Sequence, residues 1–141
     1  GRSCLAFNLA LDIIKPTGFS FEDKYLKRAG LDYWSNVDVN LYDSFEEYKN
    51  KFNNVRIIAF TKKSDNPISN ISYINTDILL FGREDTGLPE NVMKKCEIIA
   101  GISMPGGENQ IKSKGVRSLN LSVACGIVSY SVCQQLNLLH K

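Results

Sequence analysis

The sequence predicts an α/β domain with a mainly parallel sheet flanked by helices. Two short apolar runs, residues 55–61 (VRIIAFT) and 78–81 (ILLF), have the composition of parallel strands buried on both faces. Segments with helix signals precede and follow these runs, so strand and helix patterns alternate along the chain. Such alternation is typical of proteins in which helices cover a parallel sheet.

The amino-terminal third already shows this alternation. Residues 4–10 have a helix-like pattern, and residues 12–15 form a short predicted strand that a proline ends. Residues 21–29 (FEDKYLKRA) place acids first and bases last and are followed by Gly30, as in a short helix with a glycine after its last turn. Residues 37–41 are predicted as the second strand.

The elements after this third are predicted from caps and apolar spacing. Ser44 and Glu47 have the S-x-x-E spacing of a capping box, which opens a helix to about residue 52. Residues 88–96 are predicted as one helix with a proline in its first turn, and residues 98–104 as a further strand. Residues 119–139 contain no proline and repeat apolar residues at three- and four-residue steps, which predicts a long helix.

Composition excludes several classes of protein. A chain of 141 residues with 43% hydrophobic and 23% charged residues has an ordinary globular balance, which argues against wholesale disorder, and no apolar run is long enough to span a bilayer. A net charge of +2 does not by itself identify a nucleic-acid-binding protein. The four cysteines form no C-x-x-C pair and there is one histidine, which favours free thiols over a metal site or a disulfide.

Two clusters carry the chemical information. Residues 81–89 (FGREDTGLP) follow a buried strand, where α/β proteins bind small molecules, although a structural turn explains the glycines equally well. Residues 116–122 (VRSLNLS) open the long helix, where Ser118, Asn120 and Ser122 can cap free N–H groups. Residues 105–115, between the last strand and this helix, carry three glycines and two lysines and are predicted to be a mobile loop.

In this order the two clusters resemble motifs two and three of the SPOUT family of RNA methyltransferases. The resemblance is greatest to the small tRNA 2′-O-methyltransferases that modify the wobble nucleotide, and it extends through residues 16–19 (PTGF) and 23–33 (DKYLKRAGLDY). Gly1 and Arg2 match the end of motif one, G-N-I-x-R. The resemblance thus implies a single domain over residues 1–141 that lacks its first strand and most of motif one.

The resemblance implies a deep trefoil knot at the C-terminus that binds S-adenosyl-L-methionine. The matching cofactor-binding positions are Phe60, Gly82, Glu84, Gly87, Ile102, Met104, Ser118 and Leu119. Core packing explains Phe60, Ile102 and Met104 as well, and Glu84 is expected to hold its loop and Arg2 in place through hydrogen bonds.

The implied reaction transfers a methyl group to a ribose 2′-hydroxyl of tRNA, with Arg2, Asn120 and Tyr130 as the catalytic positions. Arg2 would act as the base or anchor a phosphate, and a guanidinium pKa near ~12.5 makes the first role difficult. Asn120 would orient the hydroxyl or brace the knot. Tyr130 would lie near the substrate, although an ordinary half-buried tyrosine has the same pattern.

The partners implied are tRNA and a second copy of the chain, without a metal or a membrane. The cations expected to contact RNA are Lys24, Lys27, Arg28, Lys112, Lys114 and Arg117, although solvated charge clusters look the same in a sequence. Ribosomal RNA is an alternative substrate, and a non-catalytic knotted RNA-binding protein is the alternative of another class. The cytoplasm is the expected location, with an organelle left open.

Overall fold

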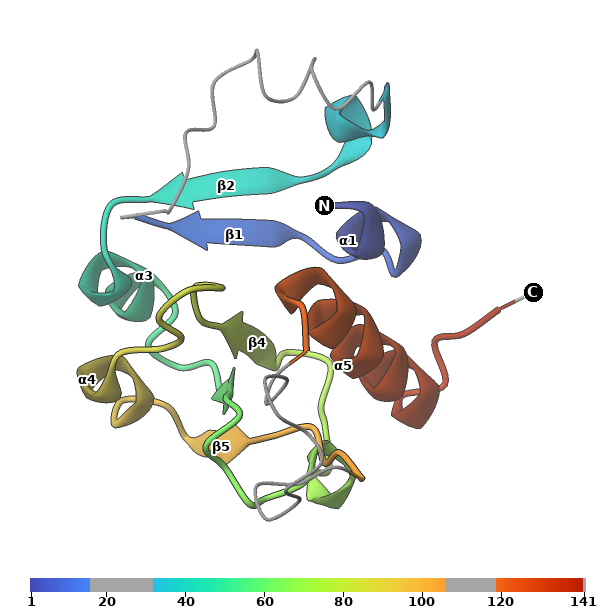
Figure 1. Cartoon of the computed structure of the whole chain (residues 1–141). Coiled ribbons are helices and arrows are strands. Elements are labelled where there is room, and N and C mark those ends of the chain that lie inside the picture. The colour runs from blue at the N-terminus through green and yellow to red at the C-terminus, as the bar shows by residue number, and fades with distance from the viewer. Residues whose placement is uncertain (16–31, 106–118, 141) are drawn as a thin grey trace. The chain divides into compact units, whose positions relative to one another are not determined.

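The computed structural model describes residues 1–15, 32–105 and 119–140. The chain divides into two compact units, Gly1–Asn53 and Asn54–Lys141, and each has its own parallel sheet (Figure 1). The α/β class with parallel strands flanked by helices is therefore confirmed, while the assignment of the whole chain to one domain stays a prediction. None of the described helices is long and apolar enough to cross a membrane.

A two-stranded parallel sheet forms the centre of the first unit. Its elements are α1 (Arg2–Ala6), β1 (Leu11–Ile14), the 3-10 helix η1 (Asp32–Asn36), β2 (Val39–Tyr42) and α3 (Phe45–Lys51). Leu11 pairs with Val39 and Ile14 with Tyr42, so the two strands match along their whole length. Both strands predicted in this part of the chain are confirmed, with slightly displaced ends.

Contacts from α3 fix this helix on the small sheet. The rings of Tyr42 and Tyr48 meet edge to face with their centroids 4.8 Å apart. The Tyr48 hydroxyl donates a hydrogen bond of 2.7 Å to the carboxylate of Asp12 in β1. At the helix start the Ser44 hydroxyl accepts from the N–H of Glu47 at 3.1 Å, as the capping-box spacing predicts.

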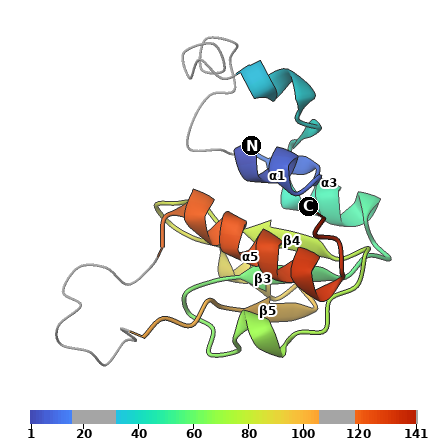
Figure 2. The ribbon, with the colours of Figure 1, turned by 90° about the vertical axis from the view of Figure 1, so that its right-hand side faces the viewer.

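A three-stranded parallel sheet in the order β4–β3–β5 forms the centre of the second unit. Its elements are β3 (Ile57–Phe60), the 3-10 helix η2 (Ile68–Asn70), β4 (Ile78–Phe81), α4 (Glu90–Met93), β5 (Ile98–Ala100) and α5 (Leu121–Gln135). The helix α5 lies along one face of the sheet (Figure 2), and its Val128 and Val132 join the main hydrophobic cluster. The central strand β3 is fully enclosed, because Ile57, Ile58 and Ala59 are each 0% exposed.

Polar bonds fasten the amino ends of these strands. The Arg56 guanidinium donates two hydrogen bonds, of 2.7 and 2.6 Å, to the carboxylate of Asp77, whose side chain is 1% exposed. The carboxylate of Glu97 accepts from the backbone N–H of Ile57 at 2.7 Å. Because the strands are parallel, all these bonds lie at one edge of the sheet. The loops that follow the strands lie at the opposite edge of the sheet, where ligands bind in α/β proteins.

The last three elements are shorter than the sequence predicts. The helix α4 starts after Pro89 because this proline has extended backbone and serves as the N-cap. The strand β5 ends where the N–H of Gly101 donates to the carbonyl of Asn66 and the carbonyl of Gly101 accepts from the N–H of Ile68, the first residue of η2. The helix α5 ends because Asn137 has a left-handed backbone, with φ of 58°, and the next N–H donates to Cys133 at 2.8 Å. This bond is that of a Schellman motif.

Some predictions lie outside the described residues. These are the helix at 21–29 and all of the 105–115 loop except its first residue. The predicted knot depends on the chain between β5 and α5, of which residues 106–118 are not described. The knot stays a prediction.

Candidate active site

A pocket of about 290 Å³ opens at the carboxyl edge of the β4–β3–β5 sheet. The loops after all three strands and the start of α5 line it. The described lining includes seven of the eight predicted cofactor positions, namely Phe60, Gly82, Glu84, Gly87, Ile102, Met104 and Leu119. The volume is near the lower end of the roughly 300–1,000 Å³ range of small-molecule sites. The structure brings these residues together, and their contact with a cofactor stays a prediction.

Two stacked aromatic rings form a wall of the pocket. Phe60 and Phe81 are the last residues of β3 and β4, and they pair in register. Their ring centroids are 5.1 Å apart and the ring planes differ by 19°. Phe60 also belongs to the hydrophobic cluster, and Ile102 packs against it. Core packing and pocket lining are thus two functions of the same side chains.

The loop after β4 folds back on itself. Arg83 and Gly87 exchange two backbone hydrogen bonds of 3.3 and 2.8 Å. A Cβ on Gly82 would lie 2.3 Å from the carbonyl carbon of Gly87 and 2.4 Å from the nitrogen of Leu88. Gly87 has φ of 72°, a conformation that favours glycine. The structural turn that the sequence left open is therefore present, and the same turn forms one side of the pocket.

An ion pair, and not Glu84, braces this loop. Nε and Nη2 of Arg83 donate to the Asp85 carboxylate, each at 3.0 Å, and this hydrogen bonding lowers the pKa of Asp85. The Glu84 side chain is exposed and makes no hydrogen bond or ion pair within the described part of the chain. The expectation that Glu84 holds its loop by hydrogen bonds is wrong, because the neighbouring residues do so.

Two predicted catalytic residues lie on or beside α5. The side-chain oxygen of Asn120 accepts from the N–H of Ser122 at 2.9 Å and from its hydroxyl at 2.7 Å, so Asn120 is the N-cap of the helix. Tyr130 is 49% exposed and is not part of the pocket lining. The capping explanation is confirmed for Asn120, and the catalytic roles of both residues stay predictions.

The remaining predicted positions are Arg2, in the first unit, and seven residues outside the described part of the chain. Arg2 is exposed at the start of α1, in the first unit, and its part in the reaction stays a prediction. Seven predicted positions lie outside the described residues: Ser118, Lys24, Lys27, Arg28, Lys112, Lys114 and Arg117.

Two cations of the lining, Lys62 and Lys63, are not among the positions predicted from the sequence. They follow directly after the strand predicted at 55–61. Sites form at the carboxyl ends of parallel strands, and both lysines lie at such an end. In the sequence, however, a charged pair after a strand looks the same as a solvated turn.

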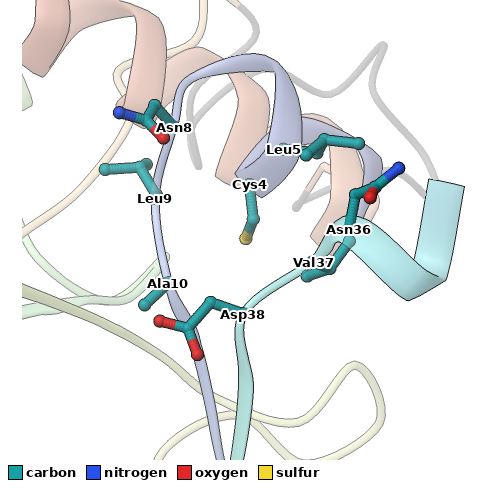
Figure 3. Close-up of a pocket in the computed structure, with 8 residues that line it drawn as sticks. All are labelled: Cys4, Leu5, Asn8, Leu9, Ala10, Asn36, Val37 and Asp38. Atoms are coloured by element: carbon teal, nitrogen blue, oxygen red, sulfur yellow. The ribbon is translucent and has the colours of Figure 1, made fainter.

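A second hollow, of about 140 Å³, lies within the first unit between α1 and the start of β2. Figure 3 shows the Cys4 sulfur pointing into it, with Asp38 and Val37 on the facing side. This volume is well below that of small-molecule sites. Burial raises the pKa of the Cys4 thiol, which keeps it protonated and a weak nucleophile. The hollow therefore does not compete with the larger pocket as a cofactor site.

The four cysteines form no disulfide in the structure. Within residues 1–15, 32–105 and 119–140, no group of three or more His, Cys, Asp and Glu side chains could hold a metal ion.

Comparison with known proteins identifies the family. The model of the SpoU rRNA methylase family matches residues 1–130. A Bacillus subtilis protein, provisionally named tRNA (cytidine(34)-2′-O)-methyltransferase, is 38% identical over 96% of this chain and 82% of its own length. A solved structure concerned with the 2-OH methylation of C/U34 on tRNA is also 38% identical, with a TM-score of 0.84 over 96% of this chain and 84% of that one.

The fold extends to more distant structures. An AdoMet-bound rRNA methyltransferase from Sinorhizobium meliloti is 22% identical and has a TM-score of 0.78, covering 99% of this chain and 50% of its own. At that identity the likeness concerns the fold alone. Because the family model spans nearly the whole sequence, the chain belongs to the SpoU rRNA methylase family.

Proposed function

We propose that this chain is an S-adenosyl-L-methionine-dependent methyltransferase that modifies the ribose 2′-hydroxyl of tRNA nucleotide 34. The observation that carries the proposal is the pocket at the carboxyl edge of the second sheet, which gathers the loops after three parallel strands. The choice of tRNA and of nucleotide 34 rests on relatives that are 38% identical and match more than four-fifths of their own length.

The residues of the pocket fit this cofactor. Phe60, Phe81, Ile102 and Leu119 give it apolar surface, and the loop after β4 gives it backbone groups. An adenine has apolar faces and a polar edge, which suits apolar walls with a few polar groups. The stacked rings hold each other in place, so this wall is formed without a ligand.

When bound, S-adenosyl-L-methionine supplies an electrophilic methyl group. The chain must hold the RNA so that the 2′-oxygen faces that group, and it must accept or pass on the hydroxyl proton. Arg2 is the proposed residue for the second task, or for anchoring a phosphate beside the target ribose. Phosphate anchoring suits a guanidinium better, because it stays protonated. We propose that Asn120 and Tyr130 lie near the RNA substrate.

The test is methyl transfer from labelled S-adenosyl-L-methionine to bulk tRNA by the full chain, followed by mapping of the product nucleotide. The expected product is a 2′-O-methyl group at nucleotide 34. Transfer to ribosomal RNA alone would assign the other substrate. Binding of tRNA without transfer to either RNA would support a non-catalytic RNA-binding protein.

We also propose that the chain acts as a homodimer. Val123, Ile127 and Tyr130 recur at four- and three-residue steps on α5 and are 49%, 37% and 49% exposed. This apolar stripe is suited to the helix of a second copy. Light scattering at micromolar concentration should report twice the chain mass, and Ile127→Lys should reduce it to one. A fully active monomer would contradict the proposal.

A further inference from the structure

The turn after β3 brings two neighbouring cations to the rim of the pocket. Lys62 and Lys63 both line the pocket and are both exposed. Within the described part of the chain, neither ammonium group forms an ion pair. The third cation of the lining, Arg83, is already paired with Asp85. With Glu84 counted, the described lining still has one more positive than negative charge.

Hydrogen bonds within the turn hold its backbone in a single conformation. The Thr61 hydroxyl accepts from the N–H of Lys63 at 3.3 Å, and the carbonyl of Thr61 accepts from the N–H of Ser64 at 3.3 Å. The Ser64 hydroxyl in turn accepts from the N–H of Asn66 at 3.1 Å. Both lysines are therefore carried by an ordered backbone.

Further bonds tie the turn to the end of β5. The Ser64 hydroxyl and the Asn66 amide donate to the carbonyl of Ile99 at 3.3 and 3.1 Å. A Cβ on Gly101 would lie 2.7 Å from the Ser64 carbonyl oxygen and 2.8 Å from that of Thr61. The two strand ends thus meet in backbone contact, and binding at the lysines need order only the lysine side chains.

We propose that Lys62 and Lys63 bind phosphate groups of the tRNA strand that carries the target ribose. The inference rests on the proposed function, because it takes the pocket as the place of methyl transfer. A ribose in an RNA strand has a phosphate on either side, and lysine ammonium groups are common phosphate ligands. The cofactor is a poorer partner, since its sulfonium and ammonium charges outnumber its one carboxylate and would repel the two lysines.

The test replaces both lysines by alanine in the full chain and measures affinity for bulk tRNA between 0.05 and 0.5 M salt. Each lost contact to single-stranded RNA lowers the slope of log affinity against log salt by about 0.7, so the double variant should lose about 1.4. If the plots of log affinity against log salt for the unmodified chain and the double variant meet near 1 M salt, the affinity of the double variant at 0.1 M salt is about 25-fold lower. Lys62→Arg with Lys63→Arg should keep most of the slope.

The chain offers a matched control in Lys94 and Lys95, a second exposed pair that does not line the pocket. Lys94→Ala with Lys95→Ala removes the same charge, and its salt slope should stay within about 0.3 of the unmodified chain. Equal losses in the two double variants would overturn the proposal, because they would show a nonspecific effect of net charge. Equal melting temperatures verify that both variants fold.

Affinity for S-adenosylhomocysteine, measured by calorimetry, distinguishes the remaining outcomes. We expect less than a twofold change in the Lys62 and Lys63 double variant. Loss of this affinity with an unchanged RNA slope would overturn the proposal and assign the lysines to the cofactor. A failure of the proposed function can be distinguished from a failure of the lysine assignment. In the first case the unmodified chain itself transfers no methyl group to tRNA. Binding of tRNA without a salt-slope difference would likewise overturn the assignment.

Discussion

Substitution of Gly82 by alanine tests whether the loop after β4 shapes the pocket. An added Cβ would lie 2.3, 2.4 and 2.8 Å from three backbone atoms of Gly87 and Leu88. Carbon atoms in ordinary contact are about 3.5–4.0 Å apart, so the loop has to move by about 1 Å or more. Overpacking of this kind costs about 1–3 kcal/mol. For a chain of this length, this cost corresponds to a fall in Tm of about 4–12 °C.

Gly87→Ala is the matched control, because it changes the same loop without the clash. Nothing lies within 4 Å of a Cβ added at Gly87, but its φ of 72° is unfavourable for alanine. The left-handed backbone costs about 1–2 kcal/mol, and the reduced freedom of the unfolded chain offsets about 0.4–1 kcal/mol of that. Gly87→Ala should therefore lower the Tm less than Gly82→Ala does.

The two variants should also differ in ligand binding. Gly87 and Leu88 line the pocket, so their displacement in Gly82→Ala should weaken S-adenosylhomocysteine binding at least tenfold, measured by calorimetry. Gly87→Ala should stay within about threefold, because its backbone has no clash to relieve. If Gly82→Ala melts and binds like the unmodified chain, the loop does not have the close approach described here, and the reasoning is refuted.

Two further predictions concern the hydrogen bonds of single side chains. Burial and the bond to Asp12 raise the pKa of Tyr48 above its ordinary value of about 10, so its contribution to stability is complete below that pH and is lost as the pH rises further. Denaturant unfolding should show that Tyr48→Phe costs about 2 kcal/mol at pH 7 and that the difference narrows in alkali. Asn120→Ala should cost about 1 kcal/mol by removing the cap of α5, whereas Asn120→Asp should keep the cap. If both Asn120 variants lose methyl transfer equally, Asn120 has a role beyond capping the helix. If Asn120→Asp keeps methyl transfer, Asn120 acts only as the cap.

The central strand of the second unit could be predicted because burial on both faces requires a run of apolar residues. Within the run at 55–61, residues 57–60 are all apolar, as a central parallel strand must be, and these residues form β3. Helix ends were harder to predict, because they depend on single backbone angles. Asn137 ends α5 by taking φ of 58°, a conformation that asparagine permits but does not require. Asn8 ends α1 with φ of 55°, well before residue 10.

Some residues of the site could be predicted from the sequence and others could not. The family resemblance implied seven cofactor positions that lie around one pocket in the structure, because the carboxyl ends of parallel strands converge. It did not find Lys62 and Lys63, because a charged pair after a strand has no pattern that distinguishes a site from a solvated turn. It also assigned bracing to Glu84, where the geometry of a planar guanidinium favours the neighbouring Arg83 and Asp85 pair.

The glycines at the strand ends explain why the pocket can exist before any ligand arrives. A side chain at Gly82 would strike the returning loop after β4, and one at Gly101 would strike the turn after β3. In both places the close neighbour is the protein's own backbone, so the absence of a side chain lets loops pack against strand ends. The two loops, which follow directly after Phe60 and Phe81, thereby gain fixed conformations, and the rings of these two residues already stack. Substrate binding then need not pay to order the backbone of the described lining, and the binding energy remains available for aligning the RNA.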